Sequence, residues 1–279
     1  MKKFLAVFDG FKISGSTMDY AIQLTKAANA HLVGLFLDEF MYRSYNVSAV
    51  IKKYDDYEAA IKLLDEKDKK KRDAAVSRFQ KACGKAGIKF SIRRSTSIAI
   101  QDLKHESMFA DMIIINENET FTRAKEKPPT RFIKDLLADV QCPVLVVPEK
   151  FKAIDKIVLL YDGGPSALYA CKMFSYLLGD LVHQPIEVLT IKNRENTLRL
   201  PDNKLMREFT KRLFPDATYT IKKGDPEEQV VAHLRSHKGN ELVVLGAYRR
   251  SEISRWFKIS MADVLMKELD TPLFIAHNK

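Results

Sequence analysis

The sequence is internally repeated: three motifs occur in the same order in each half of the chain. The first is an apolar run that ends in Asp-Gly, the second an acidic residue followed by an apolar strand, and the third a Pro followed by an apolar run. Three matches in one order indicate a duplicated structural unit. The matched segments are residues 4–10 with 157–163, 111–116 with 241–246, and 142–147 with 271–276.

The length of the chain, 279 residues, is sufficient for two domains of ordinary size. We expect the first domain over residues 1–149 and the second over residues 153–279. The boundary falls in the short segment 148–152.

Apolar strands alternate with helical patterns in both halves, which predicts an α/β fold. The strands are continuously apolar, as is typical of parallel strands buried on both faces. A helix from about Tyr54 to Cys83 is predicted, and the first half carries an extra aromatic segment, residues 38–57, that we expect to cover its strand ends. The expected strands are 3–9, 31–37, 88–94, 111–116 and 143–148, then 155–161, 185–191, 217–222, 241–246 and 272–276.

The net charge of +10, from 46 Lys and Arg against 36 Asp and Glu, raises the question of nucleic-acid binding. The densest charged run, residues 66–73, alternates in sign and contains no aromatic residue. This pattern favours a solvated helix face, with polyanion binding as the weaker alternative.

The cysteines and the apolar segments bear on location. Cys83, Cys142 and Cys171 are odd in number and widely spaced, which favours reduced thiols over disulfides or a zinc site. No segment has the length of apolar sequence that a membrane span needs. We therefore expect a cytoplasmic protein without membrane contact.

Asp-Gly pairs end the first strand of each half, at Asp9-Gly10 and Asp162-Gly163. In an open parallel sheet, ligands bind beyond the carboxyl ends of the strands. A carboxylate there accepts hydrogen bonds from a purine amino group or a ribose hydroxyl, and it can equally shape the start of the following helix. Both interpretations stay open at this point.

The ordered set of strand-end Asp, apolar fourth strand, long loop, helix and Cys-Pro-Val-Leu-Val-Val final strand (residues 142–147) resembles the universal stress protein family, in both halves. The resemblance implies two tandem, doubly wound, five-stranded parallel sheets with strand order 3-2-1-4-5, of the adenine nucleotide alpha hydrolase-like type. It also implies that the two final strands pair, so that the halves form an intramolecular pseudo-dimer.

In nucleotide-binding members of that family, the loop after the fourth strand has the pattern Gly, two residues, Gly, nine residues, Gly, then Ser or Thr. Here the second half keeps Gly246 and Ser260 but has Arg249 and Ile259 at the other two positions. The first half keeps no glycine and has Asn116, Thr130 and Arg131 at the first and last two positions. Placing a side chain in a left-handed conformation costs about 1–2 kcal/mol. The loop is therefore expected to be weakened in the second half and lost in the first.

Two further features of the second half leave alternatives open. Arg249, Arg250 and Arg255 could bind phosphate through their side chains, or the loop could be solvated over Trp256 and Phe257. His233 and His237 are four apart, but the sequence offers no third metal ligand, which favours a surface pair and no metal site. The candidate ligand-binding residues are Asp162, Gly163, Gly246, Arg249, Ser260, Asp9 and Gly10.

We expect a non-catalytic regulatory or binding module, because no nucleophile with a base and no acid–base pair stands out. Any cofactor is expected to be ATP or another adenine nucleotide, bound weakly in the second half. The protein partner is not specified by the sequence. The alternatives are an ATP-binding or ATP-hydrolysing protein that uses the second half and, more weakly, a basic nucleic-acid-binding protein.

Overall fold

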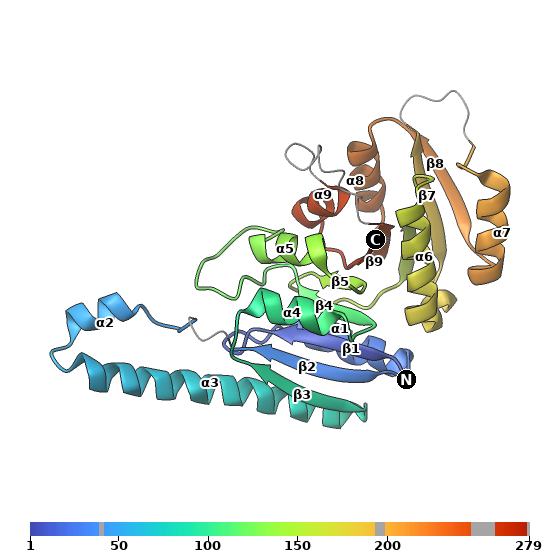
Figure 1. Ribbon diagram of the computed structural model, residues 1–279. Helices are drawn as coiled ribbons and strands as arrows, with labels where there is room; N and C mark the ends of the chain where they lie inside the picture. Colours follow the sequence, from blue (N-terminus) through green and yellow to red (C-terminus); the bar gives the residue numbers. More distant parts are fainter. Residues whose placement is uncertain (39–41, 193–198, 247–259, 278–279) are drawn as a thin grey trace.

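The computed structural model describes residues 1–38, 42–192, 199–246 and 260–277. Each half alternates strands with helices (Figure 1). The first half contains β1 (Lys3–Phe8), α1 (Gly15–Ala27), β2 (His31–Leu37), α2 (Val47–Lys53), α3 (Tyr57–Ala86), β3 (Phe90–Ser95), α4 (Ala99–Ser107), β4 (Met112–Asn116), α5 (Arg131–Asp139) and β5 (Val144–Val147).

The second half repeats this order without a counterpart of α2 among the described residues. A short 3₁₀ helix, Gly179–His183, precedes its second strand. The second half contains β6 (Lys156–Leu160), α6 (Pro165–Leu178), β7 (Ile186–Lys192), α7 (Asn203–Leu213), β8 (Thr218–Lys223), α8 (Pro226–Ser236), β9 (Glu241–Gly246), α9 (Met261–Glu268) and β10 (Leu273–Ala276).

The described strands form a single ten-stranded sheet in the order β3-β2-β1-β4-β5-β10-β9-β6-β7-β8. Each half therefore has the strand order 3-2-1-4-5, which confirms the predicted fold class. Strands within each half are parallel, whereas β5 and β10 pair antiparallel, with Leu145 opposite Phe274. The expected pairing of the two final strands is present. Because the two halves share one sheet through the pairing of β5 with β10, the proposed boundary between two domains stays a prediction.

The sheet is buried on both faces, as the continuously apolar strands predict. One core contains side chains of α1, α3, α6 and α7, and the other contains side chains of α4, α5, α8 and α9. Equivalent helices of the two halves therefore cover the same face of the sheet. The three cysteines are buried and unpaired. None of the helices in the described part of the chain is long and apolar enough to cross a membrane.

The segment between the halves is held by residues from both of them. The hydroxyl of Tyr20 in α1 donates to the carbonyl oxygen of Lys152 at 2.9 Å, and the ring of Tyr20 packs against Phe151. The Asn240 side chain, just before β9, donates to the same carbonyl at 2.8 Å and to the Tyr20 hydroxyl at 3.1 Å. These bonds link helix α1 of the first half to strand β9 of the second.

The helix α3 begins at Tyr57, three residues later than predicted, because Asp56 caps it by accepting a hydrogen bond from Ala59 N. Its carboxyl-terminal half packs on the sheet through Phe79 and Cys83, which are fully buried. Its amino-terminal half projects beyond the sheet together with α2 (Figure 1). The extra segment of the first half therefore covers the strand ends only in part.

Candidate functional sites at the strand ends

Because β5 and β10 pair antiparallel, the strands of the two halves run in opposite directions. The carboxyl ends of the strands, where ligands bind in such sheets, therefore lie along opposite borders of the sheet in the two halves. Asp9 follows β1 at one edge, and Asp162 lies just beyond β6 at the other. Each carboxylate accepts a hydrogen bond from the backbone N–H two residues later, from Phe11 at 2.8 Å and from Gly164 at 2.7 Å. Both aspartates therefore shape the turn that leads into the next helix.

The two aspartates differ in exposure. Asp9 is 3% exposed, whereas Asp162 is exposed to solvent. The hydroxyl of Tyr42, from the extra segment, donates a hydrogen bond to Asp9, and the Tyr42 ring packs edge-on against Phe11 at 5.1 Å between ring centres. Burial raises the pKa of Asp9. We call the space beyond the strand ends of the first half, around Asp9, the first crevice, and the equivalent space around Asp162 the second crevice. Of the aromatic and Met side chains expected to cover the first crevice, Tyr42 does so, while Phe40 and Met41 lie outside the described residues.

Two buried glutamates follow β4 in the first half, and the sequence analysis did not identify them. Glu119 and Glu117 are 7% and 5% exposed. Burial, followed by the charge of Asp9, raises the pKa of Glu119 to about 8. Burial, followed by the charges of Asp270 and Glu149, raises the pKa of Glu117 to about 8. Glu119 lies three residues after Asn116, which is the position of the middle glycine in the family loop. This spacing could have identified it.

Arginines complete the closure of the first crevice. The guanidinium of Arg72 lies over the Phe11 ring at 4.4 Å and donates to the Tyr42 carbonyl oxygen at 2.7 Å. Arg94 donates to the buried carboxylate of Asp38 at 2.8 Å. Gly10 has no room for a side chain, because a Cβ there would lie 2.5 Å from Asp38 Oδ1. The guanidinium groups of Arg72 and Arg94 are thus held by protein acceptors, whereas the exposed Lys12 lies near both Asp9 and Glu119.

The second crevice is less occupied by its own side chains. Asp162 Oδ1 is bound to Gly164 N, and Asp162 Oδ2 has no hydrogen-bond partner among the described residues. Gly163 has a φ of +89° and lies against Pro201, a conformation that favours glycine. Lys192, Lys222 and Lys223 lie at the carboxyl ends of β7 and β8.

Gly246 ends β9 in close contact with the start of α6. A Cβ there would lie 2.4 Å from the carbonyl carbon of Ser166. In the first half the equivalent residue is Asn116, whose side chain donates to the carbonyl oxygens of Val147 and Pro148 at 3.3 and 3.1 Å. The glycine kept in the second half therefore has a packing role, whether or not it contacts a ligand.

Ser260 and Thr130, which occupy the hydroxyl position of the family loop or lie next to it, both cap helices. Ser260 accepts a hydrogen bond from Asp263 N at 3.1 Å and forms a capping box with Asp263 at the start of α9. Thr130 accepts from Ile133 N at 3.3 Å and donates to the carbonyl oxygen of Glu119 at 2.6 Å. Arg249, the remaining candidate, lies outside the described residues, as do Arg250, Arg255, Trp256 and Phe257.

The prediction of a surface pair is correct for His237, which is exposed, but not for His233, whose side chain is 14% exposed. His233 Nε2 lies 3.0 Å from a carboxylate oxygen of Glu187, and His237 Nδ1 lies 3.5 Å from a carboxylate oxygen of Glu241. Lys156 bridges both carboxylates, at 2.7 and 3.1 Å. Burial alone would raise the pKa of Glu187, but hydrogen bonds from Lys156, Thr220 and His233 lower it to about 2. This cluster is at the amino ends of the strands, opposite the crevice.

Comparison with known proteins gives structural matches only. No protein-family model matches the sequence. No curated protein matches it either. A universal stress protein from Archaeoglobus fulgidus DSM 4304 superposes with a TM-score of 0.68 at 13% identity, covering 99% of this chain and 98% of that one. A putative universal stress protein from Pseudomonas aeruginosa UCBPP-PA14 superposes with a TM-score of 0.62 at 13% identity, covering 99% and 93%.

A protein of unknown function from Pseudomonas aeruginosa PAO1 gives a TM-score of 0.61 at 13% identity, covering 99% of this chain and 92% of that one. These matches run over nearly the whole of both chains. The chain therefore has the fold of universal stress proteins, with both repeats of the unit included, as the sequence resemblance implies.

Proposed function

We propose that this chain is a tandem universal stress protein that acts as a non-catalytic binding module. In this proposal the second half binds an adenine nucleotide or a related phosphate ligand weakly, and the first half binds none. The observation that carries the proposal is the contrast between the two strand-end aspartates: Asp9 is buried under Tyr42, whereas Asp162 is exposed with one carboxylate oxygen free among the described residues.

The chemistry of the first crevice opposes a phosphate ligand. Glu119 and Asp9 are both buried there, and the charge of Asp9 adds to burial in raising the pKa of Glu119. The raised pKa of Glu119 keeps this carboxyl largely protonated at neutral pH, so burial and closure by Tyr42 oppose a phosphate there, and repulsion adds to them as Glu119 ionises near pH 8. Arg72 and Arg94 are engaged by Tyr42 and Asp38 and do not offset this repulsion.

The chemistry of the second crevice favours an anionic ligand. Asp162 can accept a hydrogen bond from a purine amino group or a ribose hydroxyl, and the lysines at the ends of β7 and β8 favour phosphate. The amino terminus of α9, capped by Ser260, adds backbone N–H groups of the kind that attract anions. Weak binding follows from the two glycines replaced by Arg249 and Ile259.

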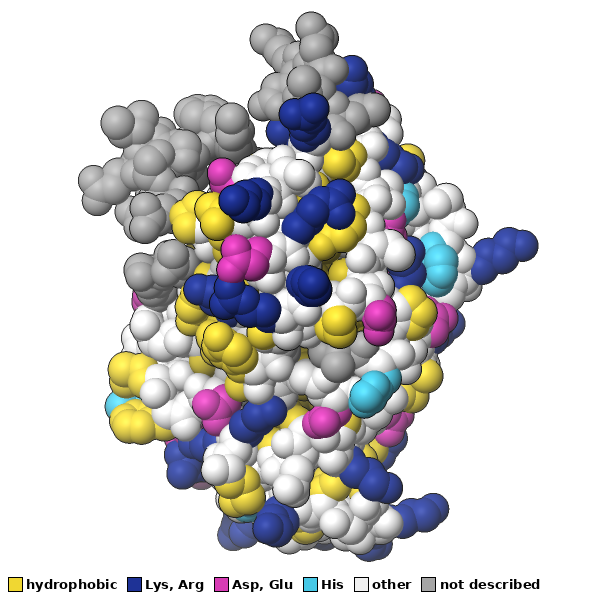
Figure 2. Space-filling view, turned by 90° about the vertical axis from the view of Figure 1, so that its right-hand side faces the viewer, with side chains coloured by type: hydrophobic (Ala, Val, Ile, Leu, Met, Phe, Trp, Pro, Cys, Tyr) yellow, Lys and Arg dark blue, Asp and Glu magenta, His cyan; other side chains and the backbone are white. Residues whose placement is uncertain are grey.

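The output of such a module would be a change in how it contacts a protein partner in the cytoplasm, and the two paired halves would act as an intramolecular pseudo-dimer. An ATP-hydrolysing protein that uses the second half is the alternative, and ADP release from bound ATP would distinguish it. Nucleic-acid binding is a weaker alternative. On the face shown in Figure 2, Lys and Arg side chains are spread among acidic and apolar ones instead of forming one continuous patch.

Calorimetric titration with ATP and Mg²⁺ tests the proposal. We expect weak binding that Asp162→Ala lowers by about tenfold, the loss of one hydrogen bond to a charged acceptor, while the matched variant Asp9→Ala leaves it unchanged. Circular dichroism would establish that both variants fold. Sub-micromolar binding unaffected by Asp162→Ala, or binding lost in Asp9→Ala alone, would show that the wrong half has been assigned.

A further inference from the structure

The helical arm formed by residues 47–72, which comprises α2 and the first half of α3, carries apolar side chains in solvent. It projects from the edge of the molecule (Figure 1). Ile51, Tyr54, Tyr57 and Leu63 are 48%, 45%, 41% and 54% exposed. Four large apolar side chains on one projecting element point to a contact surface.

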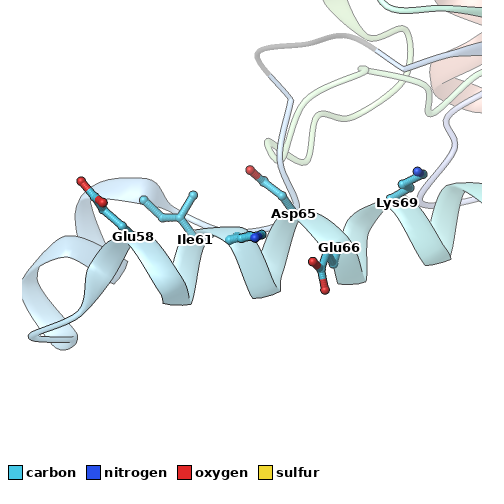
Figure 3. A pocket seen from close by; sticks show the side chains of 6 residues that line it. Glu58, Ile61, Asp65, Glu66 and Lys69 are labelled. Atoms are coloured by element: carbon cyan, nitrogen blue, oxygen red, sulfur yellow. The ribbon is translucent and has the colours of Figure 1, made fainter.

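One face of the arm is a shallow groove along α3. Most of its lining residues recur at helical spacing, so they form a single stripe. Figure 3 shows Glu58, Ile61, Asp65 and Lys69 directed to the same side of the helix. The groove is lined by Glu58, Ile61, Lys62, Asp65, Glu66 and Lys69, of which Glu66 points to the other side of the helix in Figure 3.

The charges of this stripe complement a second copy of the same stripe running in the opposite direction. The register that places Glu58 opposite Lys69 of a second copy also places Lys62 opposite Asp65. Each contact then occurs twice, because a two-fold axis repeats it.

Three of the four charged residues in this pairing have no ion-pair partner among the described residues, and the fourth, Asp65, is already paired within the chain. Glu58, Lys62 and Lys69 have no ion-pair partner within the described ranges. Asp65 is bound by Arg43 at 2.9 and 3.1 Å and by the Tyr45 hydroxyl at 2.6 Å, yet its side chain is still 42% exposed. These bonds fix the position of Asp65 on the stripe.

We propose that the arm is a self-association surface, on which the α3 helices of two copies of this chain pair antiparallel across a two-fold axis near Leu63 and Leu64. Glu58, Lys62 and Lys69 are exposed on the part of α3 that projects beyond the sheet (Figure 1). The pairing also brings the exposed apolar residues at the tip of each arm toward the body of the other molecule. Exposed ion pairs are weak individually, so the association is weak and sensitive to salt.

Sedimentation velocity of the full chain over a range of concentrations, at low and at high salt, tests this proposal. Glu58→Lys and Lys69→Glu should each weaken dimerisation at low salt by about tenfold, because each creates two like-charge contacts in the dimer. The double variant should restore it, and so should an equimolar mixture of the two single variants, in which every contact is again between opposite charges. Lys85→Glu, near the other end of α3, is the matched control and should have no effect.

A wild-type chain that is monomeric at low salt at every soluble concentration would overturn the proposal. A dimer that neither Glu58→Lys nor Lys69→Glu weakens would overturn it too, since the contact would then lie elsewhere. Failure of the mixture to associate better than either single variant would exclude the antiparallel register. None of these readouts depends on whether a nucleotide binds, so they are independent of the proposed function.

Discussion

The two crevices are built on equivalent strands and on the same kind of turn, yet they differ in burial and in nearby charge. Asp9 and Asp162 both bind the N–H two residues on, but Asp9 is covered by Tyr42 and lies near the charge of Glu119, while Asp162 faces solvent. The difference comes from the extra segment and the loop after β4, outside the strands that set the fold. The difference between the two crevices is therefore carried by connecting segments.

The largest expected effect comes from replacing Glu119, the buried ionisable group of the first crevice whose pKa is about 8. The pKa of Glu119 is raised to about 8 in the folded chain, above its ordinary value of 4.5, so folding favours the protonated form. The contribution of Glu119 to the free energy of unfolding is therefore complete below about pH 4.5, and it is lost as the pH rises through about 8 and the buried carboxyl ionises. Glu119→Gln cannot ionise and should gain on the order of 4 kcal/mol over the wild type at pH 9, with little difference at pH 4.

Denaturant unfolding at several pH values measures this effect. Glu227→Gln, an exposed residue in α8, is the control and should show no such pH dependence. Equal stability of Glu119→Gln and the wild type at pH 9 would mean that the first crevice tolerates the charge.

A second test compares the equivalent residues at the ends of β9 and β4. Gly246→Ala should destabilise the chain by about 3 kcal/mol, because the new methyl group would meet the backbone of Ser166. Asn116→Ala should cost only about 1 kcal/mol, the loss of its hydrogen bonds to Val147 and Pro148. Urea unfolding checks both, and the reverse order of the two losses would contradict the packing role of Gly246.

The smallest expected difference concerns the two helix caps. Ser260→Ala should cost about 1 kcal/mol through loss of the α9 cap. Thr130→Ala should cost about 2 kcal/mol, because Thr130 is fully buried and also donates to the Glu119 carbonyl oxygen. Thermal unfolding compares the two variants, and Thr130→Ser, which keeps the hydroxyl, should recover most of the loss. Equal effects of the two alanine variants would show that the Thr130–Glu119 bond adds nothing.

The strands and their order could be predicted because each is a continuous apolar run, such as Ile113–Ile115, repeated in both halves. The hydroxyl residues Ser14 and Thr130, which cap α1 and α5, are also of the residue types that favour helix starts. The contact of Tyr42 with Asp9 could not be predicted, and neither could that of His233 with Glu187, 46 residues away. Such pairs leave no periodic pattern in the chain, since they depend on how the elements are brought together in space.

The start of α3 and the projection of the arm were missed for a related reason. The sequence predicts a long helix here but does not show where the sheet beneath it ends. The burial of Glu117 and Glu119 was equally hidden, because glutamates in a loop are exposed in most proteins. The strand-end position of the candidate site was therefore predictable, while its electrostatics were not.

The antiparallel seam between β5 and β10 has an evolutionary consequence. In an assembly of identical subunits, every substitution is expressed twice, so a change that closes one crevice closes its symmetry mate as well. Joining the halves in one polypeptide removes that constraint, while the seam keeps them together. Each repeat can then accumulate its own substitutions, and selection that acts on one crevice no longer constrains the other.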